Sequence, residues 1–356
     1  MTKKRIKVII LANEIPDDHH GWESACRRFS DQMDYRVIDL TTSNWMEKIR
    51  ETDSDILLAK PSGLISSYKQ LYDERIYIIA NELKREVFPS PLEIFIYENK
   101  RFFASWLRAH SLPHPKTHVF YQKAECLEFL KNTEYPLVAK VNIGASGSGV
   151  KILNQQEDAI SYVNASFDGS GAPQRTGPNL EKGGLLQRAV RLLFNPAKLR
   201  KRLQIYRRRQ VDLQKGFVIF QEFIPHEFEW RVVKIGDSFF AHKKLKVGEK
   251  ASGSLLKNYD NPPLAIFDFV KELTDRFGFF SQAVDLFETS DGKYLINEMQ
   301  CIFGQSDPYQ MLVNGQPGRY RYLNSKWVFE EGDFAKNACY DLRVEYVINQ
   351  LSNKKD

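Results

Sequence analysis

The sequence predicts an α/β protein in which a unit with a parallel sheet is followed by a mixed α+β part. Near the start, stretches that fit helices alternate with the short apolar runs 7–12, 35–40, 56–59 and 76–79. Such alternation is typical of a small α/β unit with a parallel sheet. Farther along, Gly236-Asp237 and Asp291-Gly292 each join two apolar runs. These dipeptides are typical of tight hairpin turns, and therefore of antiparallel strands.

Length and composition indicate several compact units. The chain has 356 residues, of which 42% are hydrophobic and 27% charged. At the usual ~100–200 residues per domain, this length corresponds to two or three units. No stretch approaches the ~18 apolar residues of a membrane span, and the run 8–12 is too short for a signal-peptide core. The four cysteines are far apart in the sequence, so we expect reduced thiols and a cytoplasmic protein.

The positive charge is local. The segment from Arg188 to Lys215 carries ten basic side chains and one acid, although the whole chain has a net charge of only +6. Three interpretations stay open: a solvated helix face, a surface for an anionic partner such as a phosphorylated or polymeric substrate, and a membrane-surface contact. Tyr206 is the one aromatic residue of this segment that adjoins an arginine, which argues against a platform for single-stranded nucleic acid.

A loop of glycine and serine lies between two predicted strands, 137–141 and 150–153. Its sequence is Gly144-Ala145-Ser146-Gly147-Ser148-Gly149. Small residues let backbone N–H groups approach an anion, so the layout favours phosphate binding, with an ordinary flexible turn as the alternative. Val150 stands where a P-loop has lysine, which excludes that motif. Instead Lys140 ends the first strand, where a lysine is rarely buried without an anionic partner.

The hairpin around Asp291-Gly292 predicts two facing carboxylates. With a two-residue turn, Ser290 faces Lys293, and Asp285 lies opposite Glu298. Strand alternation places Gln300 on the same face. Like charges in this position destabilise a sheet, and a Mg²⁺ ion with oxygen ligands offsets the repulsion. The alternative is an exposed hairpin whose acids pair with lysines.

The remaining segments complete the pattern. Helices are predicted at 98–111, 200–211 and 267–277, strands at 217–224, 230–235 and 238–241, and loops at 167–182 and 247–258.

Three pieces in this order resemble the ATP-grasp superfamily. They are Pro136-Leu137-Val138-Ala139-Lys140 with its loop, the strand Val218-Ile219-Phe220-Gln221-Glu222-Phe223-Ile224, and the hairpin that ends Asn297-Glu298-Met299-Gln300. The resemblance is to the branch of ribosomal-protein glutamate ligases, glutathione synthetases and D-alanine–D-alanine ligases. It implies a Rossmann-like pre-grasp domain at 1–97, a small ATP-grasp subdomain at 98–213 and a large one at 214–356, with ATP held between the last two.

The resemblance also implies residues for the nucleotide. Lys140 and the loop Ser146-Gly147-Ser148 would contact the phosphates, and Lys100 would be the second nucleotide lysine. The adenine edge would be read by backbone groups of Gln221, Glu222, Phe223 and Ile224, and the ribose would be held by Glu227 or Glu229.

A further set is implied for the chemistry. Glu229-Trp230-Arg231 resembles the acid-x-Arg signature of the family, so Arg231 would meet the transferring phosphate or the acyl intermediate. Lys243 or Lys244 would lie near the γ-phosphate, and Asp285, Glu298 and Gln300 would bind Mg²⁺, as one ion or two, with Mn²⁺ as a substitute. The family usually has asparagine where this chain has Gln300, whose extra methylene shifts the second metal position.

The expected activity is that of an ATP- and Mg²⁺-dependent carboxylate–amine ligase that forms an acyl phosphate and releases ADP and phosphate. A phosphotransferase acting on a small molecule and a non-catalytic nucleotide-binding protein that docks an anionic partner are the alternatives. The sequence identifies neither the carboxylate, small or polymeric, nor the amine, and it leaves open whether the chain forms a homo-oligomer.

Overall fold

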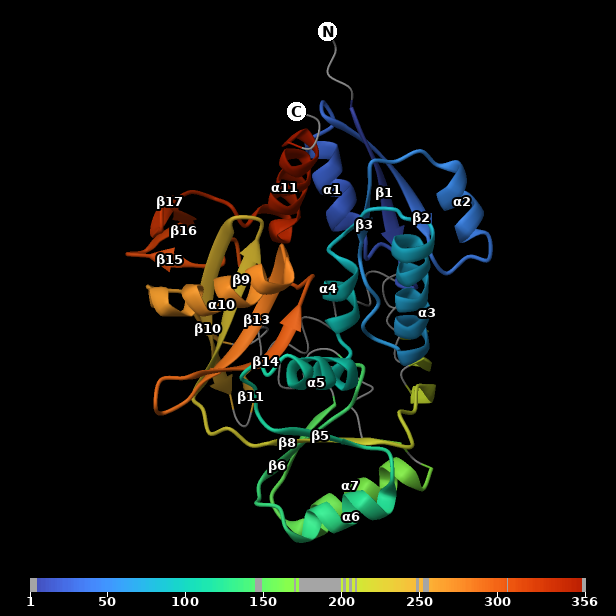
Figure 1. Ribbon diagram of the computed structural model, residues 1–356, viewed down its shortest axis with the longest axis vertical. Coiled ribbons are helices and arrows are strands. Elements are labelled where there is room, and N and C mark those ends of the chain that lie inside the picture. The colour runs from blue at the N-terminus through green and yellow to red at the C-terminus, as the bar shows by residue number, and fades with distance from the viewer. Residues whose placement is uncertain are drawn as a thin grey trace.

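The structure is a computed structural model that describes residues 5–144, 149–169, 171–172, 200, 203–204, 207–208, 210–247, 250–251, 256–305 and 307–353. The strands of these residues form three separate β-sheets. Figure 1 shows that the first and last elements of the chain lie at one end of the molecule, and that the green elements of the small sheet lie at the other.

The first sheet is parallel, as the alternation predicts. Its strands lie in the order β2-β1-β3-β4, and each neighbouring pair is parallel. The strands are β1 Ile6–Ala12, β2 Met33–Asp39, β3 Ile56–Ala59 and β4 Val87–Phe88. The helices of this part are α1 His20–Arg28, α2 Trp45–Glu51, α3 Ser66–Tyr77 and α4 Pro91–Ile96.

The apolar run 76–79 is a helix rather than the expected strand. It spans the end of α3 and the start of a short π-helical segment, Ile78–Glu82. Tyr72, Ile76 and Ile79 are all buried, and their spacing is that of one face of a helix. A four-residue apolar run does not by itself distinguish a buried strand from a buried helix, which is why the prediction was wrong.

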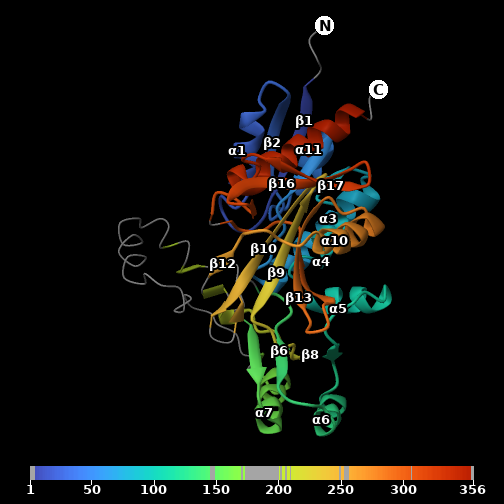
Figure 2. The ribbon, with the colours of Figure 1, turned by 90° about the vertical axis from the view of Figure 1, so that its left-hand side faces the viewer.

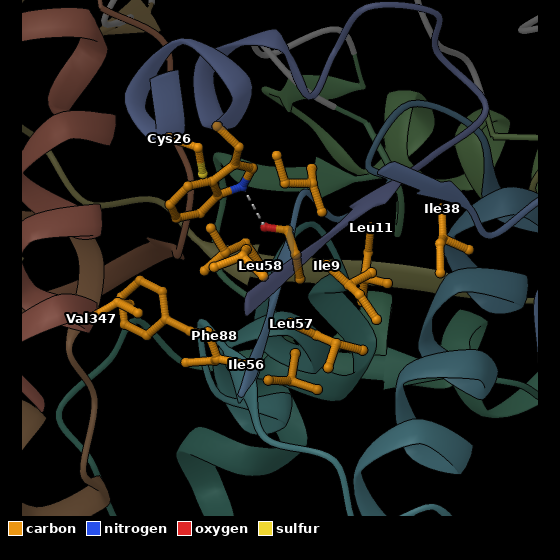
Figure 3. Close-up of a cluster of buried hydrophobic side chains, with 14 of the residues drawn as sticks. Ile9, Leu11, Cys26, Ile38, Ile56, Leu57, Leu58, Phe88 and Val347 are labelled. Atoms are coloured by element: carbon orange, nitrogen blue, oxygen red, sulfur yellow. Dashed lines mark hydrogen bonds between the residues drawn. The ribbon is translucent and has the colours of Figure 1, made fainter. Parts of the chain in front are cut away.

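The C-terminal helix completes the core of the first domain. α11, Tyr340–Asn353, places Tyr340, Val344, Val347 and Leu351 in the same hydrophobic cluster as β1, α1 and β3. Figure 3 shows Val347 beside Phe88 in this cluster, and Figure 2 shows α11 at the same end of the molecule as β1, where α11 packs against α1. The expected division that assigns 214–356 to the large subdomain therefore does not describe this helix.

The second sheet is antiparallel and has the order β5-β8-β6-β7. Its strands are β5 Thr117–Phe120, β6 Leu137–Lys140, β7 Val150–Leu153 and β8 Val218–Glu222, and the helices α6 Lys123–Lys131 and α7 Gln156–Phe167 share its core. The helix before them, α5 Lys100–Ala109, instead buries Phe103, Trp106 and Leu107 in the core of the third sheet. Because β8 pairs with both β5 and β6, it belongs to the small sheet, and the expected boundary at 213 falls too early.

The third sheet is the largest, with the order β14-β13-β9-β10-β16-β15. The strands β11, β12 and β17 pair at its margins. Gly236-Asp237 forms the predicted two-residue turn, because Ile235 pairs with Ser238. The bounds are β9 Phe228–Ile235, β10 Ser238–Val247, β11 Lys250–Ala251, β12 Lys257–Asn258, α10 Leu264–Phe277, β13 Ser281–Glu288, β14 Tyr294–Gln300, β15 Leu312–Val313, β16 Gln316–Leu323, β17 Lys326–Glu331 and a 3₁₀ turn at Lys336–Cys339.

A buried carboxylate ties the first domain to the third sheet. Oε1 of Glu93, on α4, accepts hydrogen bonds from the backbone N–H of Phe280 at 3.1 Å and of Ser281 at 2.9 Å. Arg343 of α11 donates to Oγ of the same Ser281 at 2.8 Å. Burial raises the pKa of Glu93 to about 7, even though backbone donors favour its charged form. The start of β13 is thus fixed by side chains from two other parts of the chain.

Among the described residues, no helix combines the length and the apolar character needed to cross a membrane.

Candidate functional site

The hairpin β13–β14 brings Asp285 opposite Glu298, as predicted, but by a different route. Thr289 donates to the carbonyl of Lys293 at 2.9 Å, so the turn contains three residues, Ser290-Asp291-Gly292, rather than two. The register then shifts by one residue between Asp285 and Leu286, which leaves Asn297 as a bulge. The bulge restores the facing pair that the longer turn displaces. Bulges of this kind re-aim side chains, and they often lie beside active sites.

One row of residues crosses four neighbouring strands at this point. Glu298 pairs with Asp285, Asp285 with Arg231, and Arg231 with His242. The Cα partners of adjacent strands place their side chains on the same face, so acid, base and imidazole are brought together by register alone.

Asp285 is neutralised by the chain's own cations. Arg231 donates from Nε to Oδ1 and from a terminal nitrogen to Oδ2, both at 2.8 Å, and Lys244 Nζ lies 2.8 Å from Oδ2. Burial by itself would raise the pKa of Asp285, but the two cations outweigh it and hold this pKa well below its usual range. The repulsion expected between the facing acids is therefore offset without a metal ion.

The two candidate lysines of β10 point to opposite faces. Lys244 is buried and also bonds Glu229, which is its cross-strand partner. Lys243 places Nζ 4.0 Å from the ring centroid of Phe228 and 4.9 Å from that of Trp230. Of the pair, only Lys244 lies beside Asp285, as strand alternation requires.

Lys140 and Lys100 approach the hairpin from the small sheet. Lys140 donates to Oδ1 of the bulged Asn297 at 2.9 Å. Burial and the nearby charge of Lys100 lower the pKa of Lys140 to about 8. Asn142 lies two residues after Lys140, which ends β6, and its carbonyl accepts a hydrogen bond from the backbone N–H of Lys100 at 3.2 Å. This bond holds the backbones that carry the two lysines close together.

Glu98 is a site residue that the sequence analysis missed. It is 3% exposed, its Oε2 lies 3.2 Å from Lys100 Nζ, and its Oε1 lies 3.5 Å from Gln300 Nε2. Burial raises the pKa of Glu98 to about 7, with the charge of Glu298 acting in the same direction. Its only sequence signal is an acid two residues before a lysine, which does not separate it from the many surface acids of the chain.

In the segment 221–224, which the resemblance implies for adenine, the side chains of Gln221 and Glu222 bond within the small sheet. Gln221 donates through Nε2 to Thr117 Oγ1 at 3.0 Å, and Glu222 accepts from the backbone of Lys116 at 2.7 Å, so both side chains serve the small sheet. Phe223 and Ile224 follow the end of β8. Of the two candidate ribose acids, Glu227 is exposed, whereas Glu229 is buried beside Lys244.

Two predicted features lie largely outside the described residues. Ser146, Gly147 and Ser148 are not among them, although the backbone N–H of Val141 donates to the carbonyl of Gly149 at 2.9 Å at the base of the loop. Most of the basic segment is also outside. At its C-terminal end, Asp212 accepts from the backbone of Ser66 at 2.9 Å, and Arg208 lies 5.3 Å from the ring of Tyr68.

Together these contacts define an acid–base cluster with four carboxylates and four cations. Its members are Asp285, Glu298, Glu229, Glu98, Arg231, Lys244, Lys140 and Lys100. Two carboxylates and the amide of Gln300 offer the hard oxygen donors that Mg²⁺ takes, so the residues fit that ion. Four cations around them fit a polyphosphate, whose charge they would share.

Solved structures with this architecture belong to ATP-grasp proteins. D-alanine–D-alanine ligase from Bacillus anthracis superimposes with a TM-score of 0.55 at 13% identity, covering 99% of this chain and 100% of that one. The ADP complex of an N5-carboxyaminoimidazole ribonucleotide synthetase gives 0.55 at 13% identity over 98% of this chain and 79% of that one. A RimK domain protein from Sphaerobacter thermophilus gives 0.50 at 15% identity over 82% and 90%.

The chain therefore has the ATP-grasp fold, which confirms the expected fold class. No protein-family model matches the sequence, and no curated protein is significantly similar to it.

Proposed function

We propose that this chain is an ATP- and Mg²⁺-dependent carboxylate–amine ligase. The observation that carries the proposal is the carboxylate of Asp285, which is bonded to Arg231 and Lys244 and lies opposite Glu298. Buried acids and bases in such a group are unusual, because uncompensated charges are costly inside a protein. Their arrangement suits a reaction in which phosphoryl charge must be held in place.

In the proposed reaction, a carboxylate oxygen of the substrate attacks the γ-phosphorus of ATP. The bond between this phosphorus and the β–γ bridging oxygen breaks, and ADP leaves. The amine nitrogen of the second substrate then attacks the acyl carbon, the bond from that carbon to the phosphate oxygen breaks, and phosphate and a proton leave. Little covalent work is required of the protein in such transfers, so positioned cations supply most of the catalysis.

The residues of the cluster would divide this work by position. Lys140 and Lys100 approach from the small sheet and would hold phosphate oxygens of the nucleotide. Arg231 and Lys244 lie on the central strands and would meet the transferring phosphoryl group. Backbone groups of 221–224 would bind adenine, and Glu229 would bind ribose. Asp285, Glu298 and Gln300 would hold Mg²⁺, in one or two positions and with Mn²⁺ as a substitute. The ion supplies charge neutralisation at the phosphate oxygens.

Two further parts of the proposal concern context. An anionic partner or polymeric carboxylate substrate would bind the segment between Arg188 and Lys215, whose charge supports this assignment. A cytoplasmic location is supported by Cys26, Cys126, Cys301 and Cys339, which are free thiols and buried.

Trapping with hydroxylamine tests the activity. The protein is incubated with ATP, Mg²⁺ and a panel of carboxylates, and hydroxamate and ADP are quantified. Hydroxamate that appears together with ADP is expected, whereas ADP with a stable phosphorylated product would instead identify a phosphotransferase. Nucleotide binding without any turnover would identify the non-catalytic alternative.

A matched pair of variants tests whether Asp285 is needed for turnover. Asp285→Asn should abolish turnover, whereas Asp291→Asn, in the exposed turn of the same hairpin, should leave it unchanged. Equal turnover in both variants would remove the metal assignment.

A further inference from the structure

A group of metal-ligating side chains lies at the start of α1, in the first domain and apart from the acid–base cluster. It consists of His19, His20 and Glu23, whose ligand atoms all lie within 4.8 Å of one another. The Nε2 atoms of His20 and His19 lie 3.5 Å and 4.0 Å from the same oxygen, Oε2 of Glu23. Residues three and four positions apart share one face of a helix, so the helix itself brings these groups together.

The three side chains converge without contacting one another. Both distances to Glu23 exceed the roughly 2.7–3.2 Å of an N–H···O hydrogen bond. Ion pairs close by do make contact, since Arg28 of the same helix lies 2.7 Å from Asp341. A tetrahedral ion with bonds of about 2.1 Å holds its ligand atoms about 3.4 Å apart. The separation of His20 and Glu23 is close to that value.

The imidazole of His19 makes no hydrogen bond within the part of the chain that the structure describes. Its Nδ1 is buried and has no partner there, and its Nε2 is too far from Glu23 to donate to it. The side chain is only 16% exposed. A polar group that is mostly buried without a hydrogen bond costs free energy, and a metal ion bound at Nε2 would supply a favourable interaction.

The chemistry of the group favours a particular class of ion. The oxygen of Asp17 nearest to the group, Oδ1, lies 3.6 Å from Nε2 of His20, which makes two imidazole nitrogens and two carboxylate oxygens. Imidazole ligands suit Zn²⁺, and four such ligands are typical of its tetrahedral sites. Mg²⁺ and Ca²⁺ prefer oxygen ligands alone.

We infer that His19, His20 and Glu23 bind a Zn²⁺ ion, with Asp17 as the fourth ligand, and that this ion fixes the start of α1 to the loop that precedes it. Four protein ligands leave no open position on the ion, so its role is structural. The site is separate from the proposed ligase function and does not require a nucleotide.

Calorimetric titration with Zn²⁺ tests the site on the full-length protein without a histidine tag. Excess Mg²⁺ is present to compete for sites made of oxygen ligands alone. The wild type should bind one ion in this way. His20→Ala and Glu23→Gln should each weaken the affinity at least roughly tenfold, because even a residue that only supports a metal ligand contributes about 10- to 100-fold. His118→Ala should bind as the wild type does. It removes an exposed histidine from β5, in the small sheet at the other end of the molecule (Figure 1).

Thermal unfolding gives a second readout, because an ion that binds only the folded protein raises the unfolding midpoint. Zn²⁺ should raise the midpoint of the wild type and of His118→Ala, and should leave that of Glu23→Gln nearly unchanged. The variants are expected to fold, since His20 is 58% exposed and glutamine keeps the shape of Glu23.

A wild type that binds no Zn²⁺ would overturn the inference. Wild-type affinity in both His20→Ala and Glu23→Gln would also overturn it, because the ion would then be held elsewhere. An equal loss of affinity in His118→Ala would have the same meaning.

Discussion

The guanidinium of Arg231 holds both oxygens of Asp285, with Nε 2.8 Å from Oδ1 and a terminal nitrogen 2.8 Å from Oδ2. Both side chains are nearly buried, at 11% and 1% exposed. Bidentate pairs of this kind are among the strongest side-chain interactions. Because the two residues lie on the adjacent strands β9 and β13, this contact links the strands and also holds both side chains in position within the cluster.

We predict that Arg231→Met lowers the free energy of unfolding by about 3–5 kcal/mol, because it leaves a buried carboxylate with one partner fewer. Arg321, whose pair with Glu330 is 30% exposed on each side, is the comparison, and its substitution by methionine should cost at most about 1 kcal/mol. Urea unfolding measures both values. Equal costs would show that the Arg231 pair adds no more stability than an ordinary surface pair.

Lys244→Met should reduce turnover roughly 10- to 100-fold, because the lysine lies 2.8 Å from Asp285 and a charge-assisted contact of this type is worth about 1.5–3 kcal/mol. Lys243→Met removes the same charge one residue earlier, from the opposite face. It should change turnover less than about threefold, as expected for a partly exposed cation–π contact. The ratio of kcat/KM between the two variants is the readout. A larger loss in Lys243→Met would reverse the assignment.

Glu98→Ala should lower kcat/KM for ATP by roughly 10- to 100-fold, the effect typical of a residue that positions the side chains that bind the ligand. Its contacts with Lys100 and Gln300 are the reason. The neighbouring Asn99→Ala removes the helix cap that accepts from Phe102, so it should lower stability with little effect on the affinity for ATP. Kinetics combined with thermal unfolding separates these effects. Unchanged kinetics in Glu98→Ala would exclude it from the site.

Glu93 predicts a pH dependence of stability. Burial raises its pKa to about 7 from an ordinary value of 4.5, so the folded protein binds a proton more tightly than the unfolded chain. The corresponding stabilisation is fully present below pH 4.5 and is lost as the pH rises through about 7. Glu93→Gln should therefore flatten the fall in unfolding free energy between these pH values. Glu345→Gln, on the exposed face of α11, should leave the slope unchanged.

The sequence predicts the fold class correctly because several of its strongest signals are local. Val218–Glu222 is a continuous apolar run, and each of the two hairpins consists of apolar runs joined by a turn dipeptide. The structure contains this strand and both hairpins. The facing of Asp285 and Glu298 was predicted correctly through two deviations that cancel, a longer turn and the bulge at Asn297. A bulge of one residue has no reliable sequence signal, so this agreement could not have been foreseen.

Glu98, which was not predicted, joins the cluster through contacts between distant segments. It meets Gln300 across more than two hundred positions of the chain. The choice between Lys243 and Lys244 required the register of β10 against β9. These are properties of packing, and no window of neighbouring residues contains them.

The packing of α11 has a consequence for the order in which the protein is made. During synthesis, β1 to β4 emerge long before α11, yet apolar side chains that finish their core lie between Tyr340 and Leu351. This domain therefore exposes part of its hydrophobic surface until α11 has left the ribosome. Domains of most proteins fold as units from the N-terminus onward. Here the core built on β1 to β4 cannot be completed before α11 has been made.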